Sequence, residues 1–182
     1  MLASRSGPTL YESVLGERFA ELPPALRRFH GRREGGRARG KVRVSRGRGL
    51  FARLIAWFIG APSAGEAVPV ELRIEVEGER EVWTRTFAGH TMVTRQWRAG
   101  AQLVEAFGLS QVRFELESSP AGIMFEQRRV ELLRVPLPAA LAPRVSAQAG
   151  VAEGEAWELR VNISFPLIGT VVEYASTMIV ED

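Results

Sequence analysis

Cysteine is absent from the 182-residue sequence, and His30 and His90 are its only histidines. The first absence excludes a disulfide scaffold, a zinc ribbon, an iron–sulfur site and a thiol nucleophile. The second leaves little material for a metal site, so neither a metal nor a cofactor is expected. Motifs of well-attested chemistry are also missing. There is no Gly-x-Ser-x-Gly, and Gly35–Lys41 fits a P-loop only until Val42 takes the place of Ser or Thr.

Long hydrophobic runs are missing as well. The longest, from Leu50 to Ile59, has ten residues and contains Arg53, which is about half the length needed to span a bilayer. Residues 1–9 lack the apolar stretch of a signal peptide. We therefore expect a cytoplasmic protein without a transmembrane segment. The length predicts a single domain over 1–182, in which a helix, a basic strand and an apolar helix (1–62) precede an antiparallel sheet (63–182).

Positive charge is concentrated at the start of the chain. The net charge is +3, but residues 1–53 hold 13 basic and 4 acidic residues, while 54–182 hold 11 basic and 17 acidic ones. This asymmetry predicts either an anionic partner for the first part or docking of that part on the second. The arginine-rich segment 27–53 could bind a membrane surface or nucleic acid. Nucleic acid is disfavoured, because only Phe29 and Phe51 are available beside it to stack on bases.

Two helices are predicted before the main run of strands. Apolar residues recur at three- and four-residue steps from Leu10 to Leu22, until Pro23-Pro24 ends the pattern. A second, short helix spans 50–59 and is apolar around nearly its whole circumference. Such a helix could be a buried plug of the core, a hydrophobic lid over a cavity, or an interfacial anchor beside neighbouring arginines.

From Val68 onward, apolar and polar residues mostly alternate with a period of two, which is typical of strands with one exposed face. A first strand is expected at 40–46, and further strands follow at 68–77, 82–88, 91–97, 102–107, 112–117, 124–135, 144–149, 157–165 and 170–180. The turns between them are too short for parallel crossovers. The fold predicted is mainly β: an antiparallel β-barrel, lipocalin-like or open, of about nine or ten strands. It has an N-terminal helix and a short apolar helix before the second strand.

Charged residues fall on strand faces whose other residues are apolar and are therefore expected to face the interior. Arg85 shares a face with Trp83 and Phe87, and Glu105 shares one with Leu103 and Phe107. The same alternation places Arg46 on the inner face with Val42 and Val44. It also places Glu126 and Arg128 on the inner face with Val130 and Leu132. Buried guanidinium groups need carboxylates, so we expect Arg85 to pair with Glu105, and Arg128 to pair with Glu126 or a neighbouring carboxylate. These residues would either line a ligand cavity or form structural ion pairs in a packed core.

The cavity hypothesis predicts the binding of an amphipathic, anionic small molecule or lipid-like ligand inside the barrel. The predicted ligand-binding residues are Arg46, Trp57, Trp83, Arg85, Phe87, Glu105 and Arg128. The alternative is a small-molecule enzyme that uses the same cavity, with Glu105 or Glu126 as acid or base and with Tyr174 or His30 as proton donors. Whether the chain is an enzyme stays open.

Several segments occur in an order that resembles an uncharacterised bacterial family, domain-of-unknown-function family 4166. They are Tyr11-x-x-x-Leu15-Gly16, Leu22-Pro23-x-x-Leu26-Arg27-x-x-His30-Gly31, Val44-x-Arg46-Gly47, Trp83-x-Arg85-x-Phe87, Glu105-x-Phe107-Gly108, Pro136-Leu137-Pro138 and Phe165-Pro166-Leu167-Ile168-Gly169 with Tyr174. The sequence departs from the pattern at Ser176, where the family usually has glycine. The resemblance implies no activity, but it does imply stand-alone proteins or domains attached to dehydrogenase-like partners.

Overall fold

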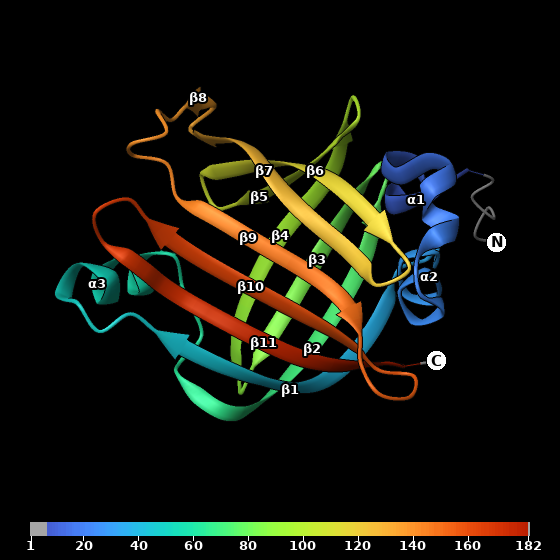
Figure 1. The fold of residues 1–182 in the computed structure, drawn as a ribbon, viewed down its shortest axis with the longest axis horizontal. Coiled ribbons are helices and arrows are strands. Elements are labelled where there is room, and N and C mark those ends of the chain that lie inside the picture. Colours follow the sequence, from blue (N-terminus) through green and yellow to red (C-terminus); the bar gives the residue numbers. More distant parts are fainter. Residues whose placement is uncertain (1–6, 182) are drawn as a thin grey trace.

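Ten antiparallel strands close into a barrel in the computed structural model, which describes residues 7–181 (Figure 1). The strands are β1 (Gly36–Arg46), β2 (Gly65–Glu77), β3 (Arg80–Phe87), β4 (His90–Ala99), β5 (Gln102–Phe107), β6 (Ser110–Ser119), β7 (Gly122–Leu132), β9 (Arg144–Val151), β10 (Trp157–Phe165) and β11 (Gly169–Glu181). Pairing of β1 with β11 and of β6 with β7 completes the ring. The two-residue strand β8 (Val135–Pro136) pairs only with β7 and lies outside it. The predicted antiparallel barrel is confirmed.

Two-residue turns join each strand from β2 to β7 to the next. In the β3–β4 turn both residues have positive φ, 47° at Ala88 and 90° at Gly89. This backbone conformation matches the right-handed twist of the flanking strands. Such tight turns keep sequential strands adjacent, so the chain runs around the barrel from β1 to β6 in order.

Short helices cover the end of the barrel near the two termini (Figure 1). Helix α1 (Leu10–Leu15) continues into the 3-10 helix η1 (Gly16–Glu21), and α2 (Pro24–His30) follows. A capping box begins α1, in which the Glu12 backbone N–H donates to Thr9 Oγ1 at 3.3 Å and the Thr9 N–H donates to the Glu12 carboxylate at 2.7 Å.

The sequence prediction for this region is only partly right. The helix expected over Leu10–Leu22 breaks into α1 and η1, and α2 was not predicted. Pro23-Pro24 ends one helix but also begins the next, because Pro24 occupies the first helical turn, where a missing N–H costs nothing.

Helix α3 (Leu50–Phe58) lies across the opposite end of the barrel, within the β1–β2 connection (Figure 1). Its inner face consists of buried Ala52 and Ala56. The interpretation of this helix as a buried plug is wrong, because Leu50, Trp57 and Phe58 are each at least three-quarters exposed. Among residues 7–181, no helix is both long enough and apolar enough to cross a membrane.

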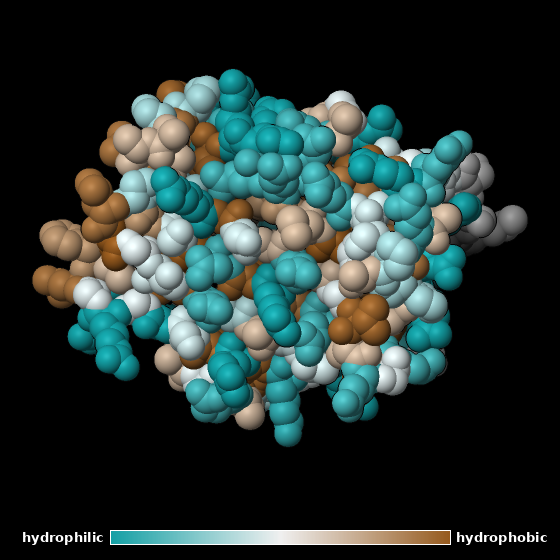
Figure 2. All heavy atoms as spheres, in the orientation of Figure 1, coloured by the Kyte–Doolittle hydropathy of each residue, from teal (hydrophilic) through white to brown (hydrophobic). Residues whose placement is uncertain are grey.

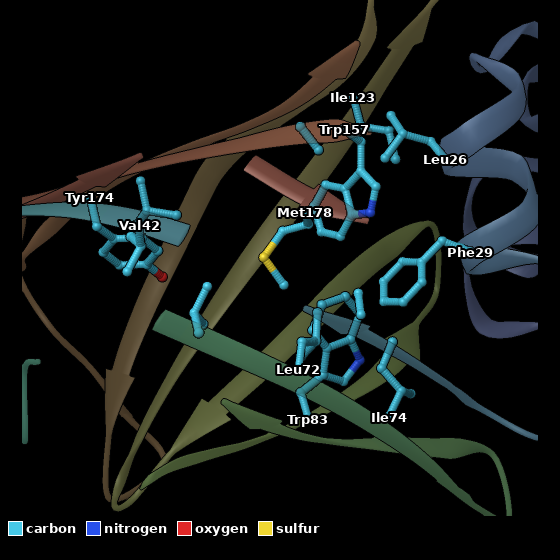
Figure 3. Close-up of a cluster of buried hydrophobic side chains, with 14 of the residues drawn as sticks. Leu26, Phe29, Val42, Leu72, Ile74, Trp83, Ile123, Trp157, Tyr174 and Met178 are labelled. Atoms are coloured by element: carbon cyan, nitrogen blue, oxygen red, sulfur yellow. The ribbon is translucent and has the colours of Figure 1, made fainter. Parts of the chain in front are cut away.

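The hydrophobic core fills the inside of the barrel at the end that the N-terminal helices close. Figure 3 shows Leu26 and Phe29 projecting from the helical side towards Trp83 and Trp157 of the strands. The Phe29 ring lies 5.1 Å from Trp157 and 6.0 Å from Trp83, measured between ring centroids. Large aromatic side chains dominate the energy of a core, so these contacts fix the helices on the barrel.

Candidate functional site

A cavity of about 380 Å³ occupies the barrel interior. It extends from Tyr11 and His30 of the N-terminal helices to Ile55 and Phe58 of α3. Most of its wall is apolar, and β7, β9 and β10 supply one continuous apolar side through Phe125, Val145, Ala147, Leu159, Val161 and Ile163. The size falls within the range of roughly 300–1,000 Å³ that is typical of ligand pockets.

Polar side chains gather on the part of the wall that β3, β4 and β5 form. The strand register places Trp83 opposite Thr94 and Gln96 opposite Glu105. Since directly opposite residues point to the same face of a sheet, these side chains and Arg85 meet inside the barrel. The cavity therefore has one polar wall and an otherwise apolar surface.

Arg85 is the centre of the polar wall and is only 7% exposed. Its Nη1 donates to Thr94 Oγ1 at 2.8 Å, and its Nη2 donates to Glu105 Oε1 at 3.2 Å. The guanidinium carbon lies 5.1 Å from the centre of the Trp83 ring, at which distance a cation–π contact is favourable. The expected Arg85–Glu105 ion pair is thus confirmed.

Tyr11 and His30 close the cavity from the helical end. The Tyr11 hydroxyl donates to Gln96 Oε1 at 3.0 Å, and the two rings stack with their centroids 3.8 Å apart. Burial lowers the pKa of His30 to about 3, so its imidazole is neutral at physiological pH. Burial raises the pKa of Tyr11 well above its usual value, and it also raises that of Tyr174 on β11, although Arg85 acts in the opposite direction there.

Glu81 is buried on β3 near α1. The Trp83 indole Nε1 donates to its carboxylate at 2.9 Å, which favours the charged form. Burial outweighs that hydrogen bond and raises the pKa of Glu81 to about 7.

Three buried nitrogens of cavity-lining residues have no hydrogen-bond partner among residues 7–181: Arg85 Nε, Trp157 Nε1 and His30 Nδ1. Buried donors without partners are rare in native proteins, because each loses its hydration without compensation. The first two are obligate donors. An acceptor within hydrogen-bond distance of either nitrogen would satisfy it. Among residues 7–181, no group of three or more His, Asp or Glu side chains is arranged to hold a metal ion.

Several of the predicted site residues lie where the sequence placed them. Trp83, Arg85 and Glu105 line the cavity, as do Tyr174 and His30, which were predicted as proton donors. The inward orientation of the β3 face is confirmed by the burial of Trp83, Arg85 and Phe87. The roles of these residues in binding or catalysis stay predictions.

Arg128 and Glu126 do not face the interior. Arg128 Nε donates to Glu115 at 2.9 Å and its Nη2 donates to Glu126 at 2.7 Å, so the expected pair forms, but on the exposed outer face. The physical reason is a bulge in β7: Arg113 pairs with Arg129 and Phe114 pairs with Gln127, which leaves Arg128 as the extra residue. An extra residue reverses the alternation of inward and outward side chains. Strict alternation from Val130 therefore predicts the wrong face for Glu126 and Arg128.

Three further predicted ligand-binding residues lie outside the cavity wall. Arg46 donates from Nε to the Pro62 carbonyl at 2.8 Å and from Nη2 to the Ala61 carbonyl, and it thereby ties β1 to the segment after α3. Trp57 points away from the barrel and is 75% exposed. Phe87 is buried, but its ring packs against Tyr174 at a centroid distance of 6.1 Å.

The sequence prediction did not include Tyr11, Thr94 and Gln96 in the site. Alternation along β4 would have placed Thr94 and Gln96 on the same face as Met92. Their side chains are neutral, however, so their burial demands no ion pair and gives a weaker sequence signal than that of Arg85 or Glu105. Tyr11 belongs to a helix, and only the docking of that helix on the barrel brings its hydroxyl to Gln96.

The basic first part of the chain contacts acidic residues of the second part on the outside of the barrel. Arg28 pairs with Glu155 at 3.2 Å, Arg39 with Glu181 at 3.2 Å and Arg43 with Glu66 at 2.8 Å. The charge asymmetry is therefore met, in part, by docking of the two parts on one another.

Comparison with known proteins places this barrel in a family. No curated protein matches the chain. A family model described as "Domain of unknown function (DUF4166)" matches residues 22–178, which include nine of the ten barrel strands in full and most of β11. The chain therefore belongs to this family of unknown function.

Proposed function

We propose that the protein binds an amphipathic small molecule inside the barrel, with an anionic, acceptor-rich head at Arg85 and an apolar tail along β7, β9 and β10. The observation that carries the proposal is the buried Arg85 guanidinium, whose Nε has no partner in the described part of the chain, in the wall of a mostly apolar cavity. Aliphatic carboxylates and related lipid-like molecules have this combination of head and tail.

The head group is inferred from the donors. Arg85 uses Nη1 and Nη2 for Thr94 and Glu105 and retains Nε. Trp157 Nε1 adds a second free donor. Hydrogen bonds from a guanidinium to a charged acceptor are roughly twice as strong as neutral ones, and a carboxylate can accept several at once. An anionic oxygen group is therefore a better acceptor for these donors than a single hydroxyl would be.

The tail is inferred from the opposite wall. Phe125, Ala147, Leu159 and Ile163 present only carbon to the cavity. Contact with such a wall stabilises a ligand by about 25 cal/mol for each Å² of apolar surface that leaves water. An aliphatic chain is the simplest occupant that matches this surface.

Acid–base catalysis by two carboxylates has less support. Glu126 lies on the outer face, and Glu105 is held by Arg85. The two groups are thus not arranged around a common substrate, whereas the arrangement of Arg85, Trp157 and the apolar wall suits binding.

The proposal predicts that Arg85→Met weakens binding of a long-chain carboxylate by about 10- to 100-fold, since a hydrogen bond to a charged group contributes roughly 1.5–3 kcal/mol. Displacement of a fluorescent fatty acid measures the affinity, and the alcohol of equal chain length should lose much less. Arg128→Met removes an exposed arginine of β7 and is the matched control, for which we expect no change.

Arg85→Met leaves Glu105 without its partner, so the double variant Arg85→Met/Glu105→Gln removes the unpaired charge and tests binding in a folded barrel. Circular dichroism checks the fold of each variant. Unchanged carboxylate affinity in the folded double variant, or absence of carboxylate binding to the wild-type protein, would contradict the proposal.

A further inference from the structure

Exposed hydrophobic side chains gather at the end of the barrel that carries α3. Twelve of the 16 large hydrophobic residues that are exposed within the described chain lie on α3 or at the strand ends and connections beside it. Figure 2 shows brown and tan spheres gathered over the end where Figure 1 places α3. We call this set the apolar rim; it comprises Leu50, Phe51, Leu54, Trp57, Phe58, Leu109, Leu132, Leu133, Val135, Leu141, Leu167 and Ile168.

The same end carries positive charge without negative charge in its connections. The up-and-down strand order brings residues 47–64, 88–89, 108–109, 133–143 and 166–168 to this end. These connections contain no Asp or Glu, but they contain Arg48, Arg53 and Arg134. A large apolar surface whose connections carry cations and no anions is complementary to the headgroup region of an anionic bilayer.

Two leucines of the apolar rim occupy turn tips in a conformation that disfavours them. Leu133 has φ 52° and Leu167 has φ 66°, in the left-handed region where glycine or asparagine is favoured. Their side chains are mostly or fully exposed, so they gain no packing within the barrel in return. An exposed apolar side chain in such a conformation favours a contact outside the protein.

Helix α3 is held so that its apolar stripe faces outward. Ala52 and Ala56 let the helix lie close to β1 and β11, and a Cβ added at Gly47 would come within 2.7 Å of the Ala52 Cβ. The outward residues Leu50, Leu54 and Trp57 recur at helical spacing, with Arg53 among them. This is the pattern of helices that lie in a membrane interface.

The cavity reaches the apolar rim. Phe58 of α3 and Leu132 at the end of β7 both line the cavity, and yet they are 81% and 41% exposed. A path between the interior and the surface therefore opens at the end that carries α3, beside Phe58 and Leu132. An apolar molecule that used this path while the rim lay on a bilayer would avoid water.

We propose that the apolar rim docks on the surface of an anionic phospholipid bilayer, and that the ligand passes between bilayer and cavity beside Phe58. The second half of this statement rests on the proposed function, whereas the docking itself does not. A bilayer fits better than nucleic acid, because the rim presents aliphatic side chains with few cations rather than a continuous basic groove.

Co-sedimentation of the full-length protein with phosphatidylcholine vesicles, with and without phosphatidylglycerol, tests the docking. We expect binding to the anionic vesicles, weakened by salt. We expect it to fall at least about tenfold in Leu54→Ser/Trp57→Ser, because two exposed apolar side chains then no longer enter the interface. The Trp57 side chain also provides a signal, since insertion shifts its emission to shorter wavelength.

Val93→Ser/Met124→Ser is the matched control, because both residues are exposed on the barrel wall away from α3. It should bind vesicles as the wild type does. Failure of the wild type to bind anionic vesicles, or equal binding by the rim variant, would overturn the docking proposal. A dimer that covers the rim in solution, detected by sedimentation velocity and abolished in the rim variant, would overturn it as well.

The two proposals fail separately. Titration with a dissolved fluorescent fatty acid, without vesicles, should give wild-type affinity in Leu54→Ser/Trp57→Ser. Vesicle binding in Arg85→Met should in turn equal that of the wild type. If the wild-type protein binds anionic vesicles but no fatty acid, only the cavity function and the transfer step are refuted. If it binds the fatty acid but no vesicles, the docking is refuted and the cavity function stands.

Discussion

Individual buried polar residues determine how this barrel responds to pH. Glu81 ionises with a pKa of about 4.5 in an unfolded chain and about 7 in the fold. The folded state therefore holds a proton that the unfolded state has released between these pH values. It follows that the contribution of Glu81 to stability is fully present below pH 4.5 and is lost as the pH rises through 7.

Glu81→Gln should remove this dependence while its side-chain carbonyl still accepts from Trp83 Nε1. We expect the variant to be more stable than the wild type at pH 8 by roughly 2–3 kcal/mol and close to it at pH 4.5. Urea unfolding at both values measures the difference. Glu79→Gln, in the exposed β2–β3 turn, is the control. A constant difference between Glu81→Gln and the wild type over this range would refute the argument.

At the scale of elements, closure of the barrel depends on how closely β1 approaches β11. Gly40 pairs with Met178, and a Cβ added at Gly40 would lie 1.8 Å from the Thr177 carbonyl oxygen. That oxygen belongs to the backbone of a paired strand and cannot move aside without disturbing the ladder. The strand needs glycine at this position because of space, not because of an unusual φ.

Gly40→Ala should therefore destabilise the protein by roughly 1–3 kcal/mol, as overpacking does in other cores. Gly36→Ala in the same strand is the matched control, since its added Cβ would meet no atom closer than 3.4 Å, and we expect a change within about 0.5 kcal/mol. Chemical denaturation measures both. Equal stability of the two variants would show that β1 can shift relative to β11.

At the scale of the whole molecule, charge pairing on the outside of the barrel joins the basic start of the chain to its acidic remainder. The pairs Arg28–Glu155, Arg39–Glu181 and Arg43–Glu66 are largely exposed. Exposed pairs contribute little to stability and are screened by salt. The fold thus depends on the aromatic core and the closed ladder far more than on these pairs.

We expect that raising sodium chloride to about 0.5 M changes the free energy of unfolding by less than about 1 kcal/mol. The same salt should release the protein from anionic vesicles. Guanidinium is itself a salt, so urea denaturation makes the measurement, and potassium chloride should give the same curve. A loss of several kcal/mol in salt would show that the charge asymmetry holds the barrel together.

Local pattern was enough to predict the barrel, because alternation in the sequence has the same period as the pleat. The strand over 157–165 and the turns at Gly78 and Gly100 follow from residue order alone, and so does the pairing of Arg85 with Glu105, since both side chains fall on apolar faces of strands. A buried guanidinium with apolar neighbours already demands a carboxylate.

Tertiary structure alone determined the orientation of Glu126, the exposure of α3 and the closure of the cavity. The bulge at Arg128 turns Glu126 outward, and it depends on how β7 pairs with β6. The exposure of α3 and the closure of the cavity by Tyr11 depend on where helices dock, and an apolar helix is equally compatible with a core and with a bilayer. Alternation determines which face of a strand is apolar, but only contacts between distant segments determine where that face ends and what covers it.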